Sequence, residues 1–168
     1  MKLKFSSETI PLHSTASGKT FEIDVWRYSH PDATKTVYLQ AGIHGIELTG
    51  IPVVHEFMKE IEANQLAYNF ICVPLSNPMG LDSQIMGIQT GYNNLHTNQQ
   101  NCWNWNRITN LKEEPSQEGH WISTLLDLAE PADIAVSYTH LRAHETLRYL
   151  VCRLLLEDSS KVSATFPR

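Results

Sequence analysis

The 168-residue sequence has few cysteines and no cluster of basic residues. Its three cysteines, Cys72, Cys102 and Cys152, are odd in number, and their spacing fits neither a disulfide framework nor a CxxC metal site. Thirteen lysines and arginines stand against 18 aspartates and glutamates, which gives a net charge of −5. Because a phosphate-binding surface needs clustered positive charge, we do not expect nucleic acid as a partner.

Long apolar runs are also missing. No stretch reaches the roughly 18 apolar residues that a membrane-spanning helix needs, and the start, MKLKFSSETIPLHS, lacks the apolar core of a signal peptide. We therefore expect a cytoplasmic protein with reduced, buried cysteines and no membrane partner. The length and the 42% hydrophobic content suit one folded domain, and the oligomeric state cannot be derived from them.

The apolar pattern of the first 75 residues predicts strands around one helix. Residues 20–27 alternate apolar and polar side chains, as in a half-buried strand, and should form a hairpin with residues 2–10. Residues 35–40 and 68–73 are typical of strands, and residues 46–61 carry apolar side chains at helical spacing. Strand, helix and strand in this order predict a parallel βαβ unit.

The second half of the chain is less regular. Residues 77–115 show no periodicity, as in a long functional loop. A helix is predicted from Ser116 to just before Pro131, followed by a strand at 134–136. Residues 141–157 have the apolar spacing of a terminal helix.

His44 and Glu47 form the first candidate site. They follow the strand at 35–40, and their spacing of three places both on one face where a helix begins. Open α/β sheets bind ligands at this end of their strands. Imidazole and carboxylate groups are good zinc ligands, and a catalytic zinc takes three protein ligands and keeps one open position. The alternative for so short a motif is a chance pair on a solvated helix end.

Residues 41–50, Ala-Gly-Ile-His-Gly-Ile-Glu-Leu-Thr-Gly, closely resemble the zinc motif of the succinylglutamate desuccinylase and aspartoacylase family, which is related to the zinc carboxypeptidases. Two further stretches match in the same order, Asn-Pro-Met-Gly at 77–80 and Asn-Trp-Asn-Arg at 104–107. The resemblance covers about residues 36–136. It implies an α/β fold of three layers (αβα) with a mixed, partly parallel sheet. It also implies a zinc-dependent hydrolase that cleaves the amide bond of an N-acyl amino acid or a similar small carboxylate.

The resemblance assigns roles to four residues. His44 and Glu47 would be zinc ligands, and Asn106 and Arg107 would hold the carboxylate of the substrate. The planar guanidinium of Arg107 suits a bidentate contact with a carboxylate. The alternative for Arg107 is a surface arginine that stacks on a neighbouring tryptophan.

The chain departs from the family pattern at the group that polarises the scissile carbonyl. Many members have an arginine shortly before the Asn-Arg pair, and this chain has none between Arg27 and Arg107. We expect that the group is absent or replaced by a polar residue such as Asn98, Gln99 or Asn101.

The third zinc ligand is a second departure. In the family it is the histidine of an Asp-Leu-His that follows a strand resembling residues 132–136, whereas this chain continues Ser137-Tyr-Thr-His140. His140 is the candidate, although it is shifted by one residue and lacks the acidic neighbour. His140 and His144 also form an HxxxH pair, which is more often a solvated helix face than a zinc site.

The family's general base is a glutamate well downstream of the third ligand, and neither Glu145 nor Glu157 has a matching context. Residues 137–168 instead resemble translated sequencing-adapter DNA found at the ends of unrelated fragmentary sequences. We therefore expect residues 1–136 to be the N-terminal part of a zinc hydrolase domain and 137–168 to be a non-native tail, so that this chain is inactive. The alternative is a genuine, divergent terminal helix.

Two other functions are compatible with the sequence. The chain could be a non-catalytic metal or small-molecule binding domain, a view that the missing general base favours. It could also be an interaction domain that uses the tryptophans at 103–105, because exposed aromatic side chains mark interfaces. Zinc content separates the interaction domain from the other two functions.

Overall fold

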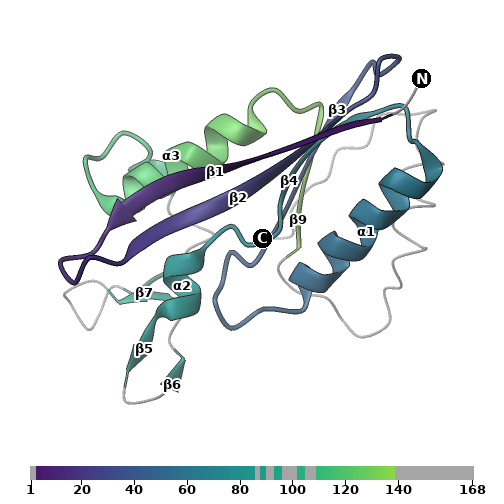
Figure 1. Ribbon diagram of the computed structural model, residues 1–168. Helices are drawn as coiled ribbons and strands as arrows, with labels where there is room; N and C mark the ends of the chain where they lie inside the picture. The colour runs from purple at the N-terminus through teal and green to yellow at the C-terminus, as the bar shows by residue number, and fades with distance from the viewer. Residues whose placement is uncertain (1–2, 86–87, 90–92, 96–101, 105–108, 139–168) are drawn as a thin grey trace.

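The computed structural model describes residues 3–85, 88–89, 93–95, 102–104 and 109–138. In this part of the chain a five-stranded sheet has the order β1-β2-β4-β3-β9 (Figure 1). Its strands are β1 (Lys4–Ser14), β2 (Thr20–Ser29), β3 (Thr36–Ala41), β4 (Asn69–Val73) and β9 (Ile134–Tyr138).

The first two strands form the predicted antiparallel hairpin. β1 extends to Ser14, four residues beyond the predicted strand, and the connecting turn contains Gly18 with a φ of 84°. Glycine suits this left-handed conformation because it has no Cβ. β2 also pairs antiparallel with β4, so the hairpin is attached to one side of the remaining sheet.

The βαβ prediction is confirmed by β3, α1 (Gly50–Asn64) and β4, because β3 and β4 are parallel neighbours. β9 runs parallel to β3 on its other side. β3 is therefore the middle one of three parallel strands, and its carboxyl end leads into the segment that contains His44. The predicted mixed, partly parallel sheet is confirmed.

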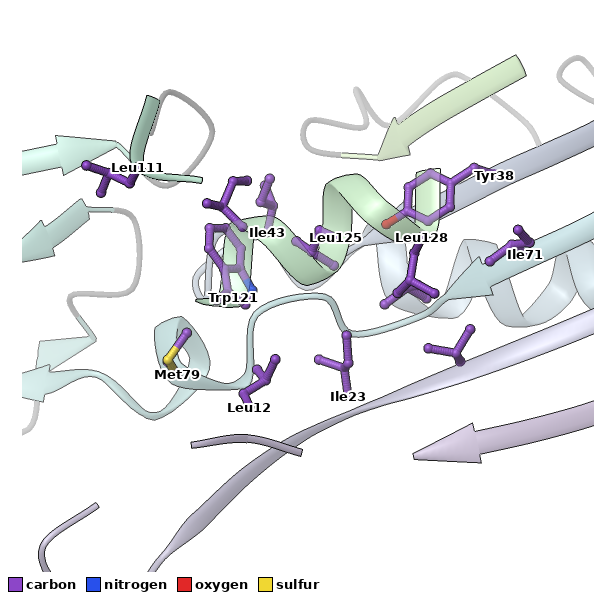
Figure 2. Packing of buried hydrophobic residues seen from close by; sticks show 13 residues of the cluster. Leu12, Ile23, Tyr38, Ile43, Ile71, Met79, Leu111, Trp121, Leu125 and Leu128 are labelled. Atoms are coloured by element: carbon purple, nitrogen blue, oxygen red, sulfur yellow. The ribbon is translucent and has the colours of Figure 1, made fainter. Parts of the chain in front are cut away.

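Each face of the sheet has its own hydrophobic core, because side chains alternate along a strand. On β3, Val37 and Leu39 belong to the core under α1, whereas Tyr38 belongs to the core under α3 (Gln117–Ala129). The side chain of Trp121 on α3 is fully buried in the second core (Figure 2). Helices thus cover both faces, which confirms the three-layer αβα fold.

Helix α1 begins at Gly50, not at the predicted residue 46. Pro52 accounts for the difference. Proline has no N–H and its ring clashes with the preceding turn inside a helix, but it fits the first helical turn. The residues before Gly50 form turns instead, and Ile46, expected on the buried face of the helix, is 49% exposed.

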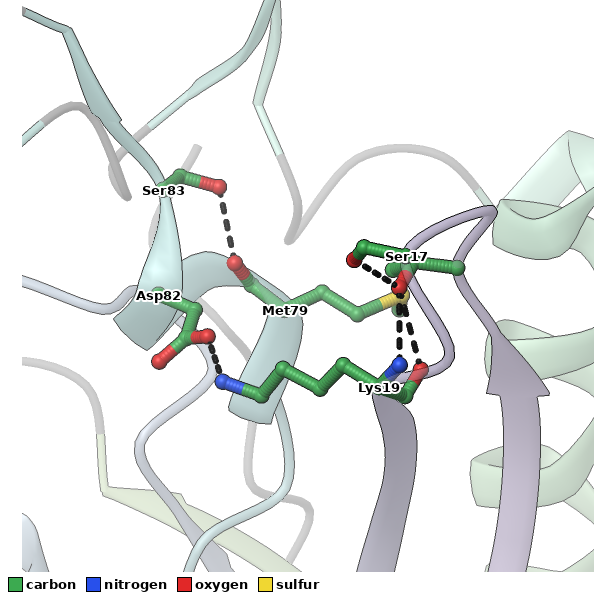
Figure 3. A network of polar contacts seen from close by, with 6 residues as sticks. Ser17, Lys19, Met79, Asp82 and Ser83 are labelled. Atoms are coloured by element: carbon green, nitrogen blue, oxygen red, sulfur yellow. Dashed lines mark hydrogen bonds and ion pairs between the residues drawn. The ribbon is translucent and has the colours of Figure 1, made fainter.

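The segment predicted as a long loop contains short elements. They are α2 (Pro78–Asp82), the two-stranded pairs β5 (Gln84–Ile85) with β6 (Ile88–Gln89) and β7 (Asn93–Leu95) with β8 (Cys102–Asn104), and the 3-10 helix η2 (Thr109–Leu111). Helix α2 lies beside the tip of the β1–β2 hairpin, where Lys19 forms an ion pair with Asp82 (Figure 3). Ser83 Oγ donates to the carbonyl of Met79 at 2.7 Å, which closes the end of this short helix.

Strand β9 runs two residues past the predicted boundary at residue 136. Ser137 pairs with Gln40, and Tyr138 pairs with Ala41 and is buried in the core under α1. The terminal helix predicted at 141–157 lies outside the described residues, and the assignment of residues 137–168 as a tail stays a prediction. Within the described segments, no helix is long and apolar enough to cross a membrane.

Candidate metal site at the carboxyl end of β3

His44 and Glu47 lie together just beyond the carboxyl end of β3. The Nδ1 atom of His44 and the Oε2 atom of Glu47 are 2.9 Å apart and share a hydrogen bond. The spacing of three had suggested that both residues lie on a helix, but α1 begins only at Gly50. A turn before α1 brings them together, in which the amide of Glu47 donates to the carbonyl of His44 at 3.0 Å.

Two glycines allow this turn to form. Gly42 has a φ of 68°, a left-handed conformation that bends the chain sharply as it leaves β3. Gly45 lies directly against the backbone of α2, where an added Cβ would be only 2.0 Å from the carbonyl oxygen of Gly80. Any side chain at Gly45 would therefore push the turn away from α2.

The site combines a buried imidazole with a carboxylate that reaches the surface. His44 is 1% exposed, whereas the side chain of Glu47 is 12% exposed. Ile46 and Leu48, which flank Glu47, are among the large hydrophobic residues that the structure leaves exposed. The pair thus combines a buried imidazole with a carboxylate side chain that is partly accessible to solvent.

The geometry of the pair fits two ligands of one zinc ion. Zinc bonds of about 2.1 Å to nitrogen and oxygen, arranged tetrahedrally, separate two donor atoms by roughly 3.4 Å. The observed 2.9 Å needs only a small adjustment. The hydrogen bond between imidazole and carboxylate would be replaced on binding, because the nitrogen that binds a metal carries no proton. Among the described residues, no group of three possible metal ligands occurs.

The structure therefore brings together two of the predicted site residues and does not place the others. Those outside the described residues are the third-ligand candidate His140 with His144, the substrate-binding pair Asn106 and Arg107, the polar candidates Asn98, Gln99 and Asn101, and the late glutamates Glu145 and Glu157. The roles assigned to them stay predictions.

Two buried hydrogen-bonding residues near the site were missed in the sequence. Ser76 is fully buried beside Asn77, and its backbone amide and Oγ both donate to the carbonyl of Ala41, the last residue of β3. Trp121 lies on α3, and its Nε1 donates to the carbonyl of Ser76 at 2.7 Å. A buried tryptophan needs a partner for its N–H, and this need was the one available signal.

The sequence matches a family model. The model for the succinylglutamate desuccinylase/aspartoacylase catalytic domain matches residues 33–131. This range includes β3, the turn with His44 and Glu47, and α3. No curated protein matches the sequence.

The fold is similar to those of several solved structures. A succinylglutamate desuccinylase/aspartoacylase family protein from Shewanella amazonensis SB2B is 22% identical with a TM-score of 0.68, over 79% of this chain and 46% of that protein. One from Shewanella frigidimarina NCIMB 400 is 20% identical with a TM-score of 0.66, over 80% and 45%. The ectoine utilization protein EutE (DoeB) from Ruegeria pomeroyi is 19% identical with a TM-score of 0.52, over 80% and 39%. The matched part is thus less than half of each of these proteins.

Proposed function

Because the chain belongs to the succinylglutamate desuccinylase/aspartoacylase family, we propose that it is the N-terminal part of a zinc-dependent hydrolase. Its substrate would be the amide bond of an N-acyl amino acid or a similar small carboxylate. The observation that carries the proposal is the 2.9 Å approach of His44 Nδ1 and Glu47 Oε2. It occurs at the carboxyl end of parallel strands, where α/β sheets of this kind bind their ligands.

In this proposal the chain's own residues divide the work between metal and substrate. His44 and Glu47 would hold the zinc, and His140 is the candidate third ligand if residues 137–168 are native. Zinc, when bound, supplies a Lewis acid that acidifies water and polarises a carbonyl group. Arg107 would hold the carboxylate of the substrate, because its planar guanidinium can form two parallel hydrogen bonds, and Asn106 would add a donor or acceptor beside it.

Burial gives His44 a defined orientation before any metal binds. The ring is enclosed and hydrogen-bonded to Glu47, so little conformational freedom has to be lost on binding. The partly exposed carboxylate of Glu47 leaves one side of the pair accessible to an ion from solvent. This arrangement supports the proposed metal site independently of the family resemblance.

Zinc affinity of the 168-residue chain, measured by competition with a chromophoric chelator, tests the proposal. His44→Ala should lower the affinity at least about tenfold, the scale of effects at metal sites. His55→Ala is the matched control, because His55 is an exposed histidine on α1 whose ring contacts Trp26 and lies away from the turn. Equal zinc affinity of the His44→Ala variant and the wild type would refute the metal site.

Hydrolysis assays separate the two remaining functions. We expect this chain to show no measurable turnover of N-acyl amino acids and a full-length family member to hydrolyse them. Zinc binding without turnover in both proteins would favour the non-catalytic metal-binding domain. Zinc-dependent turnover by the 168-residue chain would instead show that residues 137–168 complete the site.

A further inference from the structure

Two buried residues between β4 and α2 hold the chain that leads into His44. Ser76 donates to the carbonyl of Ala41 through its backbone amide at 2.8 Å and its Oγ at 2.9 Å. The amide of Asn77 donates to the carbonyl of Gly42 at 3.1 Å, and its side-chain Nδ2 donates to that of Ile43 at 2.8 Å. Three successive carbonyls before His44 therefore have partners on one short segment.

The Asn77 side chain is itself fixed in orientation. Its Oδ1 accepts from the amide of Gly80 at 2.8 Å, so its Nδ2 must face Ile43. The residue is fully buried, and a Cβ at Gly80 would lie 2.8 Å from Nδ2, which shows how closely α2 surrounds this amide group. A buried amide with both ends paired has one stable arrangement.

The bond to Ile43 is the one that bears on the metal site. The Ile43 carbonyl belongs to the peptide group that joins Ile43 to His44, and fixing this plane limits the directions that the His44 side chain can take. The bonds of Ser76 reach Ala41, three residues before His44. Asn77 and Ser76 are thus alike in burial and differ in which carbonyl they hold.

We propose that Asn77 is the positioning residue of the candidate metal site, because its Nδ2 bond to the Ile43 carbonyl aims the His44 ring at Glu47. The metal part of this inference rests on the proposed function, whereas the positioning of the turn does not. Groups that orient metal ligands typically contribute about 10–100-fold to metal affinity. The sequence motif Asn-Pro-Met-Gly then has a physical role, in which one asparagine joins α2 to the turn.

The experiment compares Asn77→Asp and Asn77→Ala with Ser76→Ala. Asn77→Asp keeps an acceptor for Gly80 and removes the donor to Ile43, whereas Ser76→Ala removes a buried side-chain donor of the same segment and keeps its backbone bonds. Two quantities are measured: zinc affinity by chelator competition, and hydrogen exchange of the amides of residues 43–48 without metal. Exchange within α1 and α3 reports whether each variant is folded.

Both Asn77 variants should bind zinc at least about tenfold more weakly and exchange faster at residues 43–48, with α1 and α3 unchanged. Ser76→Ala should keep the wild-type zinc affinity. Unchanged exchange at 43–48, or an equal loss of affinity in Ser76→Ala, overturns the positioning role. If wild type binds no zinc but Asn77→Asp still loosens residues 43–48, the positioning of the turn stands and the proposed function falls. If Asn77→Ala does not fold, Asn77→Asp alone decides the matter.

Discussion

At the scale of single residues, two glycines of the chain have opposite reasons to be glycine. Gly45 has no room for a side chain, since a Cβ would lie 2.0 Å from the Gly80 oxygen. Gly18 has a φ of 84° but nothing within 4 Å of an added Cβ. Gly45 therefore serves the close contact between the turn and α2, and Gly18 serves the conformation of the hairpin turn.

The contrast predicts different costs for the same substitution. Gly45→Ala should lower the free energy of unfolding by about 3 kcal/mol, since atoms are forced into a packed contact. Gly18→Ala should cost about 1 kcal/mol, because it adds only left-handed strain. Urea unfolding of both variants measures the difference. Comparable costs would show that the turn can move away from α2 without penalty.

The buried thiol of Cys72 should make the folded protein less stable at alkaline pH. It is a free, buried cysteine on β4, and burial raises the pKa of its thiol from 9.0 to about 12. Burial also raises the pKa of Tyr28 and Tyr38. In each case the unfolded chain gives up its proton at a lower pH than the folded chain. The stability contributed by the thiol is therefore fully present below pH 9 and is lost as the pH rises toward 12, and the two tyrosines act in the same direction from pH 10 upward.

The thiol alone should remove about 1.4 kcal/mol per pH unit above its unfolded pKa. Urea unfolding between pH 8 and pH 11 measures the loss. Cys72→Ala serves as the comparison: it should start less stable, because it leaves a small cavity, but should lose less stability with rising pH. Parallel pH profiles for the variant and the wild type would contradict the role of the thiol.

At the scale of elements, α3 depends on a side chain at its start. Ser116 lies just before the helix, and its Oγ accepts from the amide of Gly119 at 3.0 Å. The serine thereby satisfies one of the amides that have no partner within a helix. Because α3 carries Trp121, which holds the Ser76 carbonyl, this cap also secures the layer behind the candidate site.

Ser116→Ala should lower the free energy of unfolding by about 1 kcal/mol, the usual cost of losing such a cap. Ser123→Ala is the control within the same helix, because Ser123 makes only a 3.4 Å contact with Asp127 and alanine favours helix. Thermal or urea unfolding of the two variants gives the comparison. An equal loss in both would mean that the cap contributes nothing specific.

At the scale of the whole molecule, the packing of the layers shows that the folded domain includes residues 137 and 138. β9 covers one side of β3, and Tyr138 packs closely on Gly50 at the start of α1. A cut before Ser137 would remove these contacts along with the pairing of Gln40 and Ala41. A truncation that tests the predicted tail must therefore keep all residues up to Tyr138.

Removing residues 140–168 should change the free energy of unfolding by less than about 0.5 kcal/mol, as expected for a segment without a packing role. The reason is its resemblance to translated adapter DNA rather than to the family. Urea unfolding of the shortened and the 168-residue chains makes the comparison, with zinc affinity measured in parallel. A large loss of stability, or of zinc affinity, would show that the segment is native and would support His140 as a ligand.

Much of the architecture was determined by local sequence alone. The alternation at residues 20–27, the two apolar strands around one helix, and Ser116 before a helical pattern predicted the corresponding elements of the structure. These signals work because side-chain periodicity and end-capping act within a few residues. The order of glycines, His44 and Glu47 after a strand likewise indicated where a metal site would lie.

The tertiary structure decided what depends on neighbours distant in sequence. The place of β4 between β2 and β3 follows from which strand edges pair, and no local pattern encodes it. The helical spacing of His44 and Glu47 was misleading. Helix α1 begins only at Gly50, near Pro52, and a turn before it brings the two side chains together. Asn77 lies 34 residues from the carbonyl that it holds. Its role appears only when α2 packs against the turn, because a hydrogen bond between buried groups needs both partners in place.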